Sequence, residues 1–483
     1  MFAAKILEEI IAYAKCFSQN IGHAFTERTI LITAMTGTAA TDIGGQTTAK
    51  VFKYMQPSKT ATHEEIESFV DTRLNIIDEI SFASYKVLER ISSNLQSFTN
   101  CTEYIYGSID MLFLGDFCQL DAIGGNQIYL EKQQNGMMWG QTLNCLVELK
   151  GTHRFKDPFM QRVMSDIRRE GLSNEDRATF NERCIGSNGV NMPDPKITRF
   201  ATYYNKARCS INAEIFKKYL QQHHGKCTET NICKSAIVIK ANAFWGKSKK
   251  ALSFEHRKIL FEECSESDTS THNQQRCDPL LCLFYESNVM VNENSDVSNG
   301  IANGTTCLFK KAHLKPGTIL QPIKMHGFWV NAVNIDQVEC LELEWQDSPK
   351  FVGRFQVEPK QQKYLVSFPI KERDKPTTRV KTSIVLEQFP VVINFATTGH
   401  KLQGKSLLSL VIAEWSNIKN WAYVVLSRVR TLSGLFFTTP IPDNVTFSPD
   451  PLYLNMMSNL RETINTTPEQ VSELKATYNF DAI

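Results

Sequence analysis

Two apolar runs that each end in acidic residues decide the fold of this chain. The first run reads Asn75-Ile76-Ile77-Asp78-Glu79-Ile80-Ser81, and the second reads Leu112-Phe113-Leu114-Gly115-Asp116-Phe117-Cys118-Gln119. Both predict buried strands, and the helical stretch around residues 87–98 between them is long enough for a parallel crossover. The carboxyl ends of parallel strands meet at one edge of a sheet. The sequence therefore predicts an α/β sheet with carboxylates at one edge, an arrangement that suits a magnesium–triphosphate complex.

The α/β pattern continues on both sides of these strands. Residues 3–17 predict an amphipathic helix, residues 28–35 a short buried strand, and residues 36–40 the turn into another helix. The apolar face of the first helix is expected to contain Ile6, Ile10, Tyr13, Ala14 and Phe17. Farther along, residues 153–169 predict a helix, and residues 199–204 predict the first strand of a second α/β unit. We therefore expect two α/β domains, the first ending near Leu149.

The middle of the chain has a different character. Residues 220–385 predict short strands and turns, with a polar surface loop over residues 264–277, and the α/β pattern resumes in residues 391–396 and 422–426. One helix is expected in the tail, over residues 468–478. The predicted segments are 1–148 for the first domain, 149–219 and 386–445 for the second, 220–385 for a β-rich insertion, and 446–483 for the tail.

Composition narrows the class of protein. A formal net charge of +2 on 483 residues excludes a strongly basic tail, although a local groove can bind nucleic acid in a protein of balanced charge. No apolar stretch approaches the roughly 20 residues of a membrane span, which argues against membrane insertion. Thirteen cysteines without CxxC spacing fit reduced thiols in a cytosolic or nuclear setting. The spacing of His223, His224, Cys227 and Cys233 matches no zinc pattern well, and a polar loop is the better interpretation.

Several residues near the two acidic strands have the chemistry that phosphoryl transfer needs. Asp78 is a candidate magnesium ligand, Glu79 a candidate for orienting the attacking water, and Ser81 a possible aid to the metal shell. Gln119 follows Asp116 by three residues, where its amide can contact a γ-phosphate. Taken singly, the acidic pair also fits an ordinary turn after a core strand, and Gln119 fits a surface glutamine.

Cationic residues occur later in the chain. The guanidinium groups of Arg154 and Arg428 are candidates to reach the phosphates, although a surface ion pair is the usual role of a single arginine. Residues 397–406 combine hydroxyl, imidazole, amide and lysine side chains with two glycines after a buried strand. Such a loop suits a phosphate backbone, and a solvated turn uses the same residue types.

The order of these motifs resembles that of PIF/RecD-like DNA helicases of superfamily one. The resemblance covers residues 1 to about 440, and its motifs lie at 33–40, 43–47, 76–81, 114–120, 149–155, 303–305, 389–390, 398–404 and 423–435. It implies two RecA-like P-loop NTPase domains with ATP at their interface, single-stranded DNA across their tops, and a barrel-like (SH3-like) insertion in the second domain.

The resemblance also implies roles for individual residues. Asp78 and Glu79 would be the metal and water carboxylates, Gln119 the γ-phosphate sensor, and Arg154 and Arg428 the transition-state cations. Further nucleotide contacts would come from Asp116, Gln403 and Gly404. The residues that would face DNA are Thr36, Gly37, Thr47, Thr398, His400 and Lys401.

The implied activity is ATP-dependent and Mg²⁺-dependent 5′ to 3′ translocation and unwinding. Its partners would be single-stranded DNA and forked or structured duplex DNA, in repair, recombination or telomere maintenance. We expect a monomer without membrane association, in the nucleus or alternatively in the mitochondrion.

Some positions depart from the family pattern. Ala49 stands where the family has a histidine, and Asp121 and Ala122 stand where it has two prolines, which affects details of DNA contact. The glycine-rich phosphate loop that ends in Gly-Lys-Ser/Thr should precede the first helix and would fall at or before residues 1–4. We therefore expect a truncated amino end and weak or absent ATP turnover.

Two other classes of function share some of these motifs. A non-catalytic DNA-binding remnant of a helicase or mobile element is the alternative that the missing loop favours. A signalling or metabolic P-loop enzyme is disfavoured by the motifs around Lys401 and Arg428.

Overall fold

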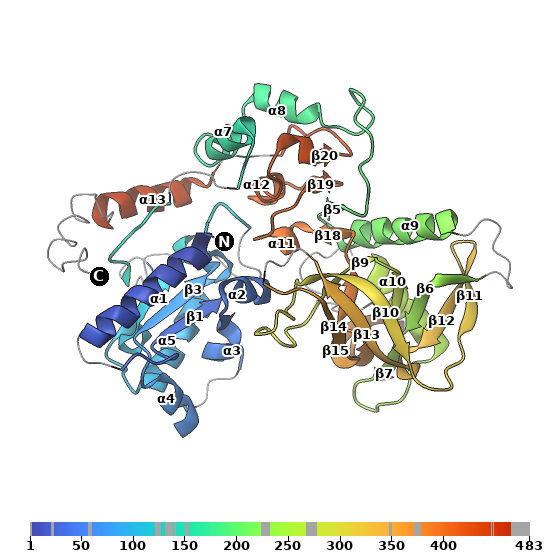
Figure 1. Cartoon of the computed structure of the whole chain (residues 1–483), viewed down its shortest axis with the longest axis horizontal. Helices are drawn as coiled ribbons and strands as arrows, with labels where there is room; N and C mark the ends of the chain where they lie inside the picture. Colours follow the sequence, from blue (N-terminus) through green and yellow to red (C-terminus); the bar gives the residue numbers. More distant parts are fainter. Residues whose placement is uncertain are drawn as a thin grey trace. The chain divides into compact units, whose positions relative to one another are not determined.

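The computed structural model divides the chain into two compact units. The described residues are 2–20, 24–56, 60–120, 127–130, 139, 142–149, 154–223, 232–266, 278–346, 350–370, 378–445, 447 and 449–464. Unit 1 contains residues 1–173, 418–424 and 446–483, and unit 2 contains residues 174–417 and 425–445. Figure 1 shows the elements of each unit, which are described separately here.

Unit 1 is built on a parallel sheet, as the sequence predicts. Its strands are β1 (Ile30–Ala34), β2 (Gln46–Thr47), β3 (Leu74–Asp78) and β4 (Asp110–Phe113), in the order β2-β1-β3-β4. Every neighbouring pair is parallel. The helices of this unit include α1 (Phe2–Asn20), α2 (Gly37–Ile43), α3 (Thr48–Phe52), α4 (His63–Phe69), α5 (Tyr85–Thr99), α7 (Pro158–Ile167) and α13 (Pro451–Ile464).

Helices α1 and α5 cover opposite faces of this sheet (Figure 1). Successive side chains of a strand point to opposite faces, and Ile76 packs with Leu7 of α1, whereas Ile77 packs with Leu88 and Ile91 of α5. All five side chains are nearly or fully buried. This two-sided burial explains why the strand before the acidic pair is apolar at consecutive positions.

Unit 2 contains a second parallel sheet. Its strands are β5 (Thr198–Thr202), β18 (Ala396–Thr398), β19 (Ser409–Ile412) and β20 (Leu435–Phe437), in the order β18-β5-β19-β20. Helices α8 (Asn174–Asn181) and α9 (Asn205–His223) and the short α11 (Gly399–Leu402) belong to the same unit. The predicted α/β class with parallel sheets is therefore confirmed.

Between β5 and β18 the chain is rich in strands. One sheet has the order β14-β13-β10-β9-β17, another β11-β12-β6-β8, and a third β15-β16-β7. The bounds are β6 (Cys233–Lys240), β7 (Asn242–Trp245), β8 (Leu280–Phe284), β9 (Asn288–Val291), β10 (Thr306–Leu314), β11 (Gln321–Met325), β12 (Phe328–Asn334), β13 (Val338–Trp345), β14 (Arg354–Val357), β15 (Lys360–Ile370), β16 (Thr378–Gln388) and β17 (Val391–Ile393). Helix α10 (Phe254–Glu266) lies in the same stretch.

One detail of the predicted second domain is corrected, and a second apolar run is assigned to a helix. Residues 391–396 form two strands in place of one, because β17 pairs antiparallel with β9 and β18 pairs parallel with β5. The apolar run near residue 422 forms helix α12 (Trp421–Leu426). A short run buried on all sides has no period that separates a strand from a helix.

The described part of the tail contains one helix. The described tail helix is α13, and the predicted helix at 468–478 lies outside the described residues. The predicted domain bounds at 149 and 446 stay predictions, and by contacts residues 149–173 and the described part of the tail belong to unit 1. A bidentate ion pair from Arg461 to Glu148, with two N–O distances of 2.7 Å, is one cause.

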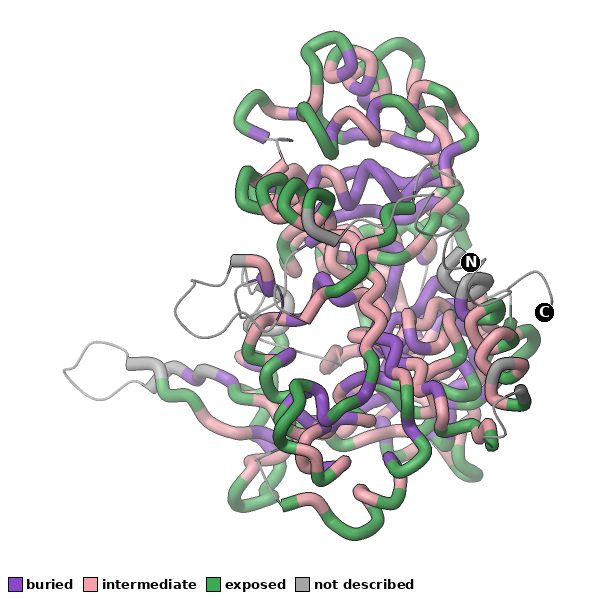
Figure 2. The backbone as a smooth tube through the Cα atoms, turned by 90° about the vertical axis from the view of Figure 1, so that its left-hand side faces the viewer, coloured by how far each residue is buried: buried purple, intermediate pink, exposed green. Residues whose placement is uncertain are grey.

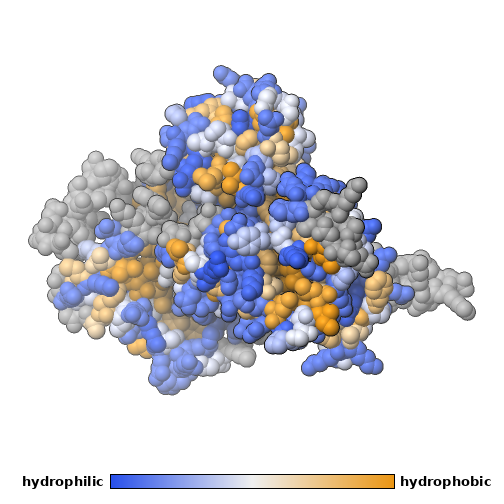
Figure 3. All heavy atoms as spheres, turned by 45° about the vertical axis from the view of Figure 1, so that its right-hand side comes forward, coloured by the Kyte–Doolittle hydropathy of each residue, from blue (hydrophilic) through white to orange (hydrophobic). Residues whose placement is uncertain are grey.

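Buried residues lie on the strands and on one face of helices such as α5 and α7, and Figure 2 shows buried and exposed segments along the backbone. Hydrophilic side chains alternate with separate hydrophobic patches on the face shown in Figure 3. Among the residues that the structure describes, no helix is both long enough and apolar enough to cross a membrane.

Candidate functional site

The acidic pair lies where β3 ends at the edge of the unit 1 sheet. The amide of Leu114 donates to the carbonyl of Ile77 (2.9 Å), and the amide of Ile80 donates to the carbonyl of Leu114 (3.0 Å). These two hydrogen bonds fix the backbone on both sides of Asp78 and Glu79. The two acidic residues between them do not take part in the pairing of β3 with β4. Glu79 has a φ of 56°, a left-handed conformation that non-glycine residues seldom adopt and that occurs at functional sites.

A glycine makes this close approach of β3 and β4 possible. A Cβ on Gly115 would lie 2.9 Å from Cγ2 of Ile80 and 3.1 Å from its backbone nitrogen. No side chain fits at that distance without displacing Ile80, which lies in the 3-10 turn (Ile80–Phe82) after β3. The glycine before Asp116 is thus required by the packing of the two acidic strands.

The environment of the pair favours binding of a cation. Burial raises the pKa of the Asp78 carboxyl, although the amide of Glu79, 2.9 Å from its Oδ1, favours the charged form. Ser81 is fully buried, and its Oγ has no hydrogen-bond partner among the described residues. Two oxygen-bearing side chains at a strand end fit a magnesium ion that keeps water and phosphate oxygens as its other ligands.

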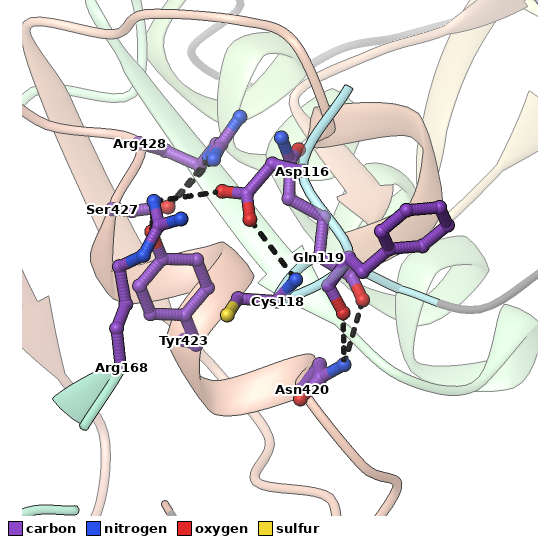
Figure 4. A network of polar contacts seen from close by, with 9 residues as sticks. Asp116, Cys118, Gln119, Arg168, Asn420, Tyr423, Ser427 and Arg428 are labelled. Atoms are coloured by element: carbon purple, nitrogen blue, oxygen red, sulfur yellow. Dashed lines mark hydrogen bonds and ion pairs between the residues drawn. The ribbon is translucent and has the colours of Figure 1, made fainter. Parts of the chain in front are cut away.

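Asp116 and Gln119 lie on a turn that follows β4 (Figure 4). The Asp116 carboxylate accepts a hydrogen bond from the amide of Cys118 (3.0 Å), and the amide of Gln119 donates to the carbonyl of Asp116 (3.1 Å). The Oε1 of Gln119 is buried and has no hydrogen-bond partner among the described residues. Because β3 and β4 are parallel neighbours, this turn lies at the same sheet edge as Asp78.

Sequence reasoning missed two residues that hold this turn. Arg168, at the end of α7, forms an ion pair with Asp116 (Nη1 to Oδ2, 3.1 Å) and donates to the Tyr423 hydroxyl (3.4 Å). The Asp116 charge helps to raise the pKa of Arg168 although burial opposes it. Asn420 donates through Nδ2 to the carbonyls of Phe117 (3.3 Å) and Gln119 (2.8 Å), as Figure 4 shows.

The other predicted residues of unit 1 lie on separate elements. Thr36 caps α2, because its hydroxyl accepts from the amide of Ala39 (3.2 Å), and Gly37 is buried as the first residue of that helix. Thr47 ends β2 and is 8% exposed. Arg154 is half-buried just before α7.

The predicted DNA-facing loop of unit 2 follows β18. Thr398 ends the strand, and Lys401 on α11 donates to Oδ1 of Asn292 (3.0 Å) and of Asn303 (3.3 Å). Lys405 donates to the carbonyl of Gly304 (2.6 Å). The structure therefore brings together two motifs that are about 100 residues apart in the sequence, at 303–304 and 398–405.

Arg428 lies beneath the same loop. Its side chain is 1% exposed, and Nη1 donates to the carbonyls of Leu402 (3.4 Å) and Lys405 (3.5 Å). Nη2 donates to the hydroxyl of Ser427 (2.6 Å). In this structure the guanidinium supports the loop, and a contact with phosphate stays a prediction.

Three further residues of this loop affect how it can bind a ligand. Both amide atoms of the Gln403 side chain are buried without a hydrogen-bond partner among the described residues. Burial lowers the pKa of His400, so its imidazole is neutral at neutral pH and adds no positive charge to the loop. Gly404 has a φ of 79°, which suits glycine.

Sequence reasoning also missed that residues 399–406 have the spacing of a phosphate-binding Walker A loop, Gly-His-Lys-Leu-Gln-Gly-Lys-Ser. Such a loop must lead into a helix, whose amino end faces the phosphates. Here it leads into strand β19. The segment is therefore not a phosphate loop of that type.

The described residues contain no cluster of three or more His, Cys, Asp or Glu side chains placed to hold a metal ion. The polar loop inferred around His223 includes His224 and Cys227, which lie outside the described residues.

Comparison with known proteins gives a structural likeness. No protein-family model matches the sequence, and the search of curated proteins finds no match. Among solved structures, the Pif1 helicase from Candida albicans is 17% identical, with a TM-score of 0.60, over 95% of this chain and 93% of that chain.

Two structures from Bacteroides agree. The Pif1 helicase in complex with ADP-AlF3 and single-stranded DNA is 17% identical, with a TM-score of 0.58, over 91% of this chain and 89% of that one. Bacteroides Pif1 bound to single-stranded DNA has the same identity and TM-score, over 94% and 91%. The chain therefore has the two-domain, RecA-like fold of the Pif1 helicases, as the order of its motifs predicted.

Proposed function

We propose that the protein is a DNA helicase that couples ATP hydrolysis to 5′ to 3′ translocation on single-stranded DNA. One observation carries the proposal: Asp78, Glu79 and the turn with Gln119 lie at one edge of a parallel sheet whose fold is that of the Pif1 helicases. The similar Bacteroides protein has been solved with ADP-AlF3 and single-stranded DNA. A likeness of fold does not assign an activity by itself, so the proposal rests on the residues at this edge.

The carboxylates have distinct proposed roles. Asp78 would hold Mg²⁺, directly or through water, with the hydroxyl of Ser81 nearby in sequence and buried. Glu79 would orient and deprotonate the attacking water, and Gln119 would contact the γ-phosphate. When bound, the metal neutralises developing charge on the phosphate oxygens.

Further nucleotide contacts are proposed for residues on other elements. Arg154 and Arg428 would stabilise negative charge on the transferred phosphoryl group, and Asp116 would fix the turn that carries Gln119 through its ion pair with Arg168. Gln403, whose buried side-chain amide has no partner among the described residues, would contact nucleotide together with Gly404.

DNA would contact the second set of residues. Lys401 provides the positive charge, and His400, as a neutral ring, would donate or accept hydrogen bonds or stack on a base. The other proposed contacts are Thr36, Gly37, Thr47 and Thr398. Forked or structured duplex DNA is the proposed substrate, in the nucleus or mitochondrion, by a monomer acting in repair, recombination or telomere maintenance.

A second candidate is a DNA-binding protein without catalysis. It is favoured by one observation: in the described part of unit 1, no Gly-Lys-Ser/Thr loop leads into a helix at the sheet edge. That loop supplies the amides and the lysine that hold the β- and γ-phosphates. We therefore expect this polypeptide to bind single-stranded DNA and to hydrolyse ATP weakly.

Paired assays on the 483-residue chain distinguish the candidates. Binding of a fluorescent oligonucleotide is measured first, and DNA-stimulated phosphate release is measured second. Binding with no hydrolysis supports the non-catalytic candidate. Strong hydrolysis that disappears in Glu79→Gln supports a helicase and overturns our expectation of weak turnover. Absence of DNA binding contradicts both candidates.

A further inference from the structure

The tail helix α13 packs on unit 1 through one face. Tyr453, Met456, Met457 and Leu460 are half-buried, whereas the residues between them are exposed, which is the spacing of a helix with one packed side. The ring of Tyr453 lies 6.5 Å from that of Phe117 and 6.1 Å from that of Tyr129. Phe117 is part of the turn that carries Gln119.

A hydrogen bond adds to these ring contacts. The Tyr453 hydroxyl donates to Sγ of Cys118, which is 7% exposed. Burial raises the pKa of the Cys118 thiol to about 11. The side chain of Tyr453 thus touches two successive residues of the turn, both immediately before Gln119.

Both ends of the helix are anchored. At its start, Asp450 forms an ion pair with Lys419, which also donates to the hydroxyl of Tyr129 (3.1 Å). Near its end, Arg461 makes the bidentate ion pair with Glu148. Bidentate guanidinium–carboxylate pairs fix orientation as well as distance, so the face with Tyr453 is held toward the turn.

We propose that α13 clamps the turn at residues 116–119 and that Tyr453 is the positioning residue that holds Gln119 in place. Arg168 and Asn420 hold Asp116 and the backbone of the turn, and Tyr453 adds a bond to the Cys118 thiol. The helix and the turn both belong to unit 1. An effect of the clamp on catalysis depends on the function proposed above.

The test uses Cys118 as a built-in reporter in the full chain. Alkylation by iodoacetamide at pH 8 is followed at each cysteine by mass spectrometry, because a thiol reacts only when it is exposed and deprotonated. Tyr453→Ala is expected to speed alkylation of Cys118 by roughly tenfold, because removal of the ring exposes the turn and its thiol. Tyr453→Phe, which keeps the ring, is expected to restore most of the protection.

Hydrogen exchange of the peptide that contains Gln119 provides a second reading. Its amide bonds to the carbonyl of Asp116, and release of the clamp should accelerate its exchange in Tyr453→Ala. Cys307, fully buried in unit 2, is the control. Arg461→Gln, which removes an anchor away from the turn, should shift both readings in the same direction and by less.

The outcomes are separable from those of the function proposed above. Unchanged Cys118 alkylation in Tyr453→Ala overturns the clamp, and so does an equal rise at Cys118 and Cys307, which reports general unfolding. Failure to bind DNA would contradict the proposed function while leaving these rates as they are. Where DNA-stimulated hydrolysis is measurable, Tyr453→Ala should lower kcat without changing KM for ATP, and Tyr453→Phe should restore it.

Discussion

Glu79 is held in a left-handed backbone conformation at the end of a strand (φ 56°), and such strain is stored where a side chain must be aimed. Replacing it with glutamine keeps the size of the side chain and removes its basicity. We expect Glu79→Gln to lower whatever DNA-stimulated hydrolysis the chain supports by about 10²- to 10⁴-fold. DNA binding should not change. Phosphate release measured with and without oligonucleotide checks the prediction, and undiminished hydrolysis would contradict the role of Glu79.

The partly buried carboxylate of Asp78 lowers the stability of the folded protein when no ligand is bound. Because burial raises its pKa in the folded state, the charged form is disfavoured there relative to the unfolded chain at neutral pH. An amide has no charge to bury, so Asp78→Asn should raise the melting temperature by about 1–3 °C while it removes any stabilisation by Mg²⁺ and nucleotide. Calorimetry with and without Mg²⁺–ATP tests both parts. A lower melting temperature would show that the carboxylate stabilises the fold.

The partly buried imidazole of His400 should make the stability of the folded protein depend on pH. Burial lowers its pKa in the folded state, so the unfolded chain takes up the proton first as the pH falls. The stability that depends on neutral His400 is therefore complete above the unfolded value of about 6.5 and is lost as the pH falls below it. His400→Gln should lose less stability than the unsubstituted chain between pH 7 and pH 5. Urea denaturation at both pH values measures the difference, and equal losses would contradict it.

At the scale of elements, Gly115 permits the contact between β3 and β4. A methyl group there would lie 2.9 Å from Ile80, so Gly115→Ala must displace Ile80 or distort the acidic turn. We expect a loss of about 1–3 kcal/mol in the free energy of unfolding. Urea denaturation measures it, with Ser84→Ala as control because the Ser84 side chain makes no capping bond to α5. An unchanged free energy of unfolding in Gly115→Ala would contradict the close packing of Gly115 against Ile80.

Elements with a clear apolar pattern were predictable from the sequence. The strands before Asp78 and Asp116 and the helix between them were expected within a few residues, because burial on both faces leaves uninterrupted apolar runs. Residues 391–396 were not, because the change of sheet at Asn394 depends on partners far away in the sequence. The sequence pattern did not assign residues 422–426 to a helix or a strand, because a short run that is almost fully buried shows neither period.

At the scale of the whole molecule, motif order predicts the candidate site residues, which stay predictions, and it does not identify the residues that support them. Arg168 and Asn420 have no motif of their own, and only the fold shows that they hold Asp116 and the turn before Gln119. Tyr453 lies in a tail that the sequence reading treated as separate. Such residues support the site only through contacts with residues far away in the sequence. A local sequence pattern therefore does not reveal them.

The loop after β18 provides the most direct test of a DNA-binding protein with this fold. Lys401 is held by Asn292 and Asn303 in a fixed position, as a backbone contact requires. The control is Lys86→Ala, which removes an exposed lysine of α5 and changes the net charge equally. Thermal melting of both variants checks that they are folded.

The decisive measurement is the affinity of the chain and of Lys401→Ala for a single-stranded oligonucleotide as a function of salt concentration. We predict that Lys401→Ala weakens binding about tenfold and reduces the slope of log K against log salt by about 0.7, the value for one lost phosphate contact, while Lys86→Ala changes neither. Equal affinity and equal slope in Lys401→Ala and the unsubstituted chain would contradict the account.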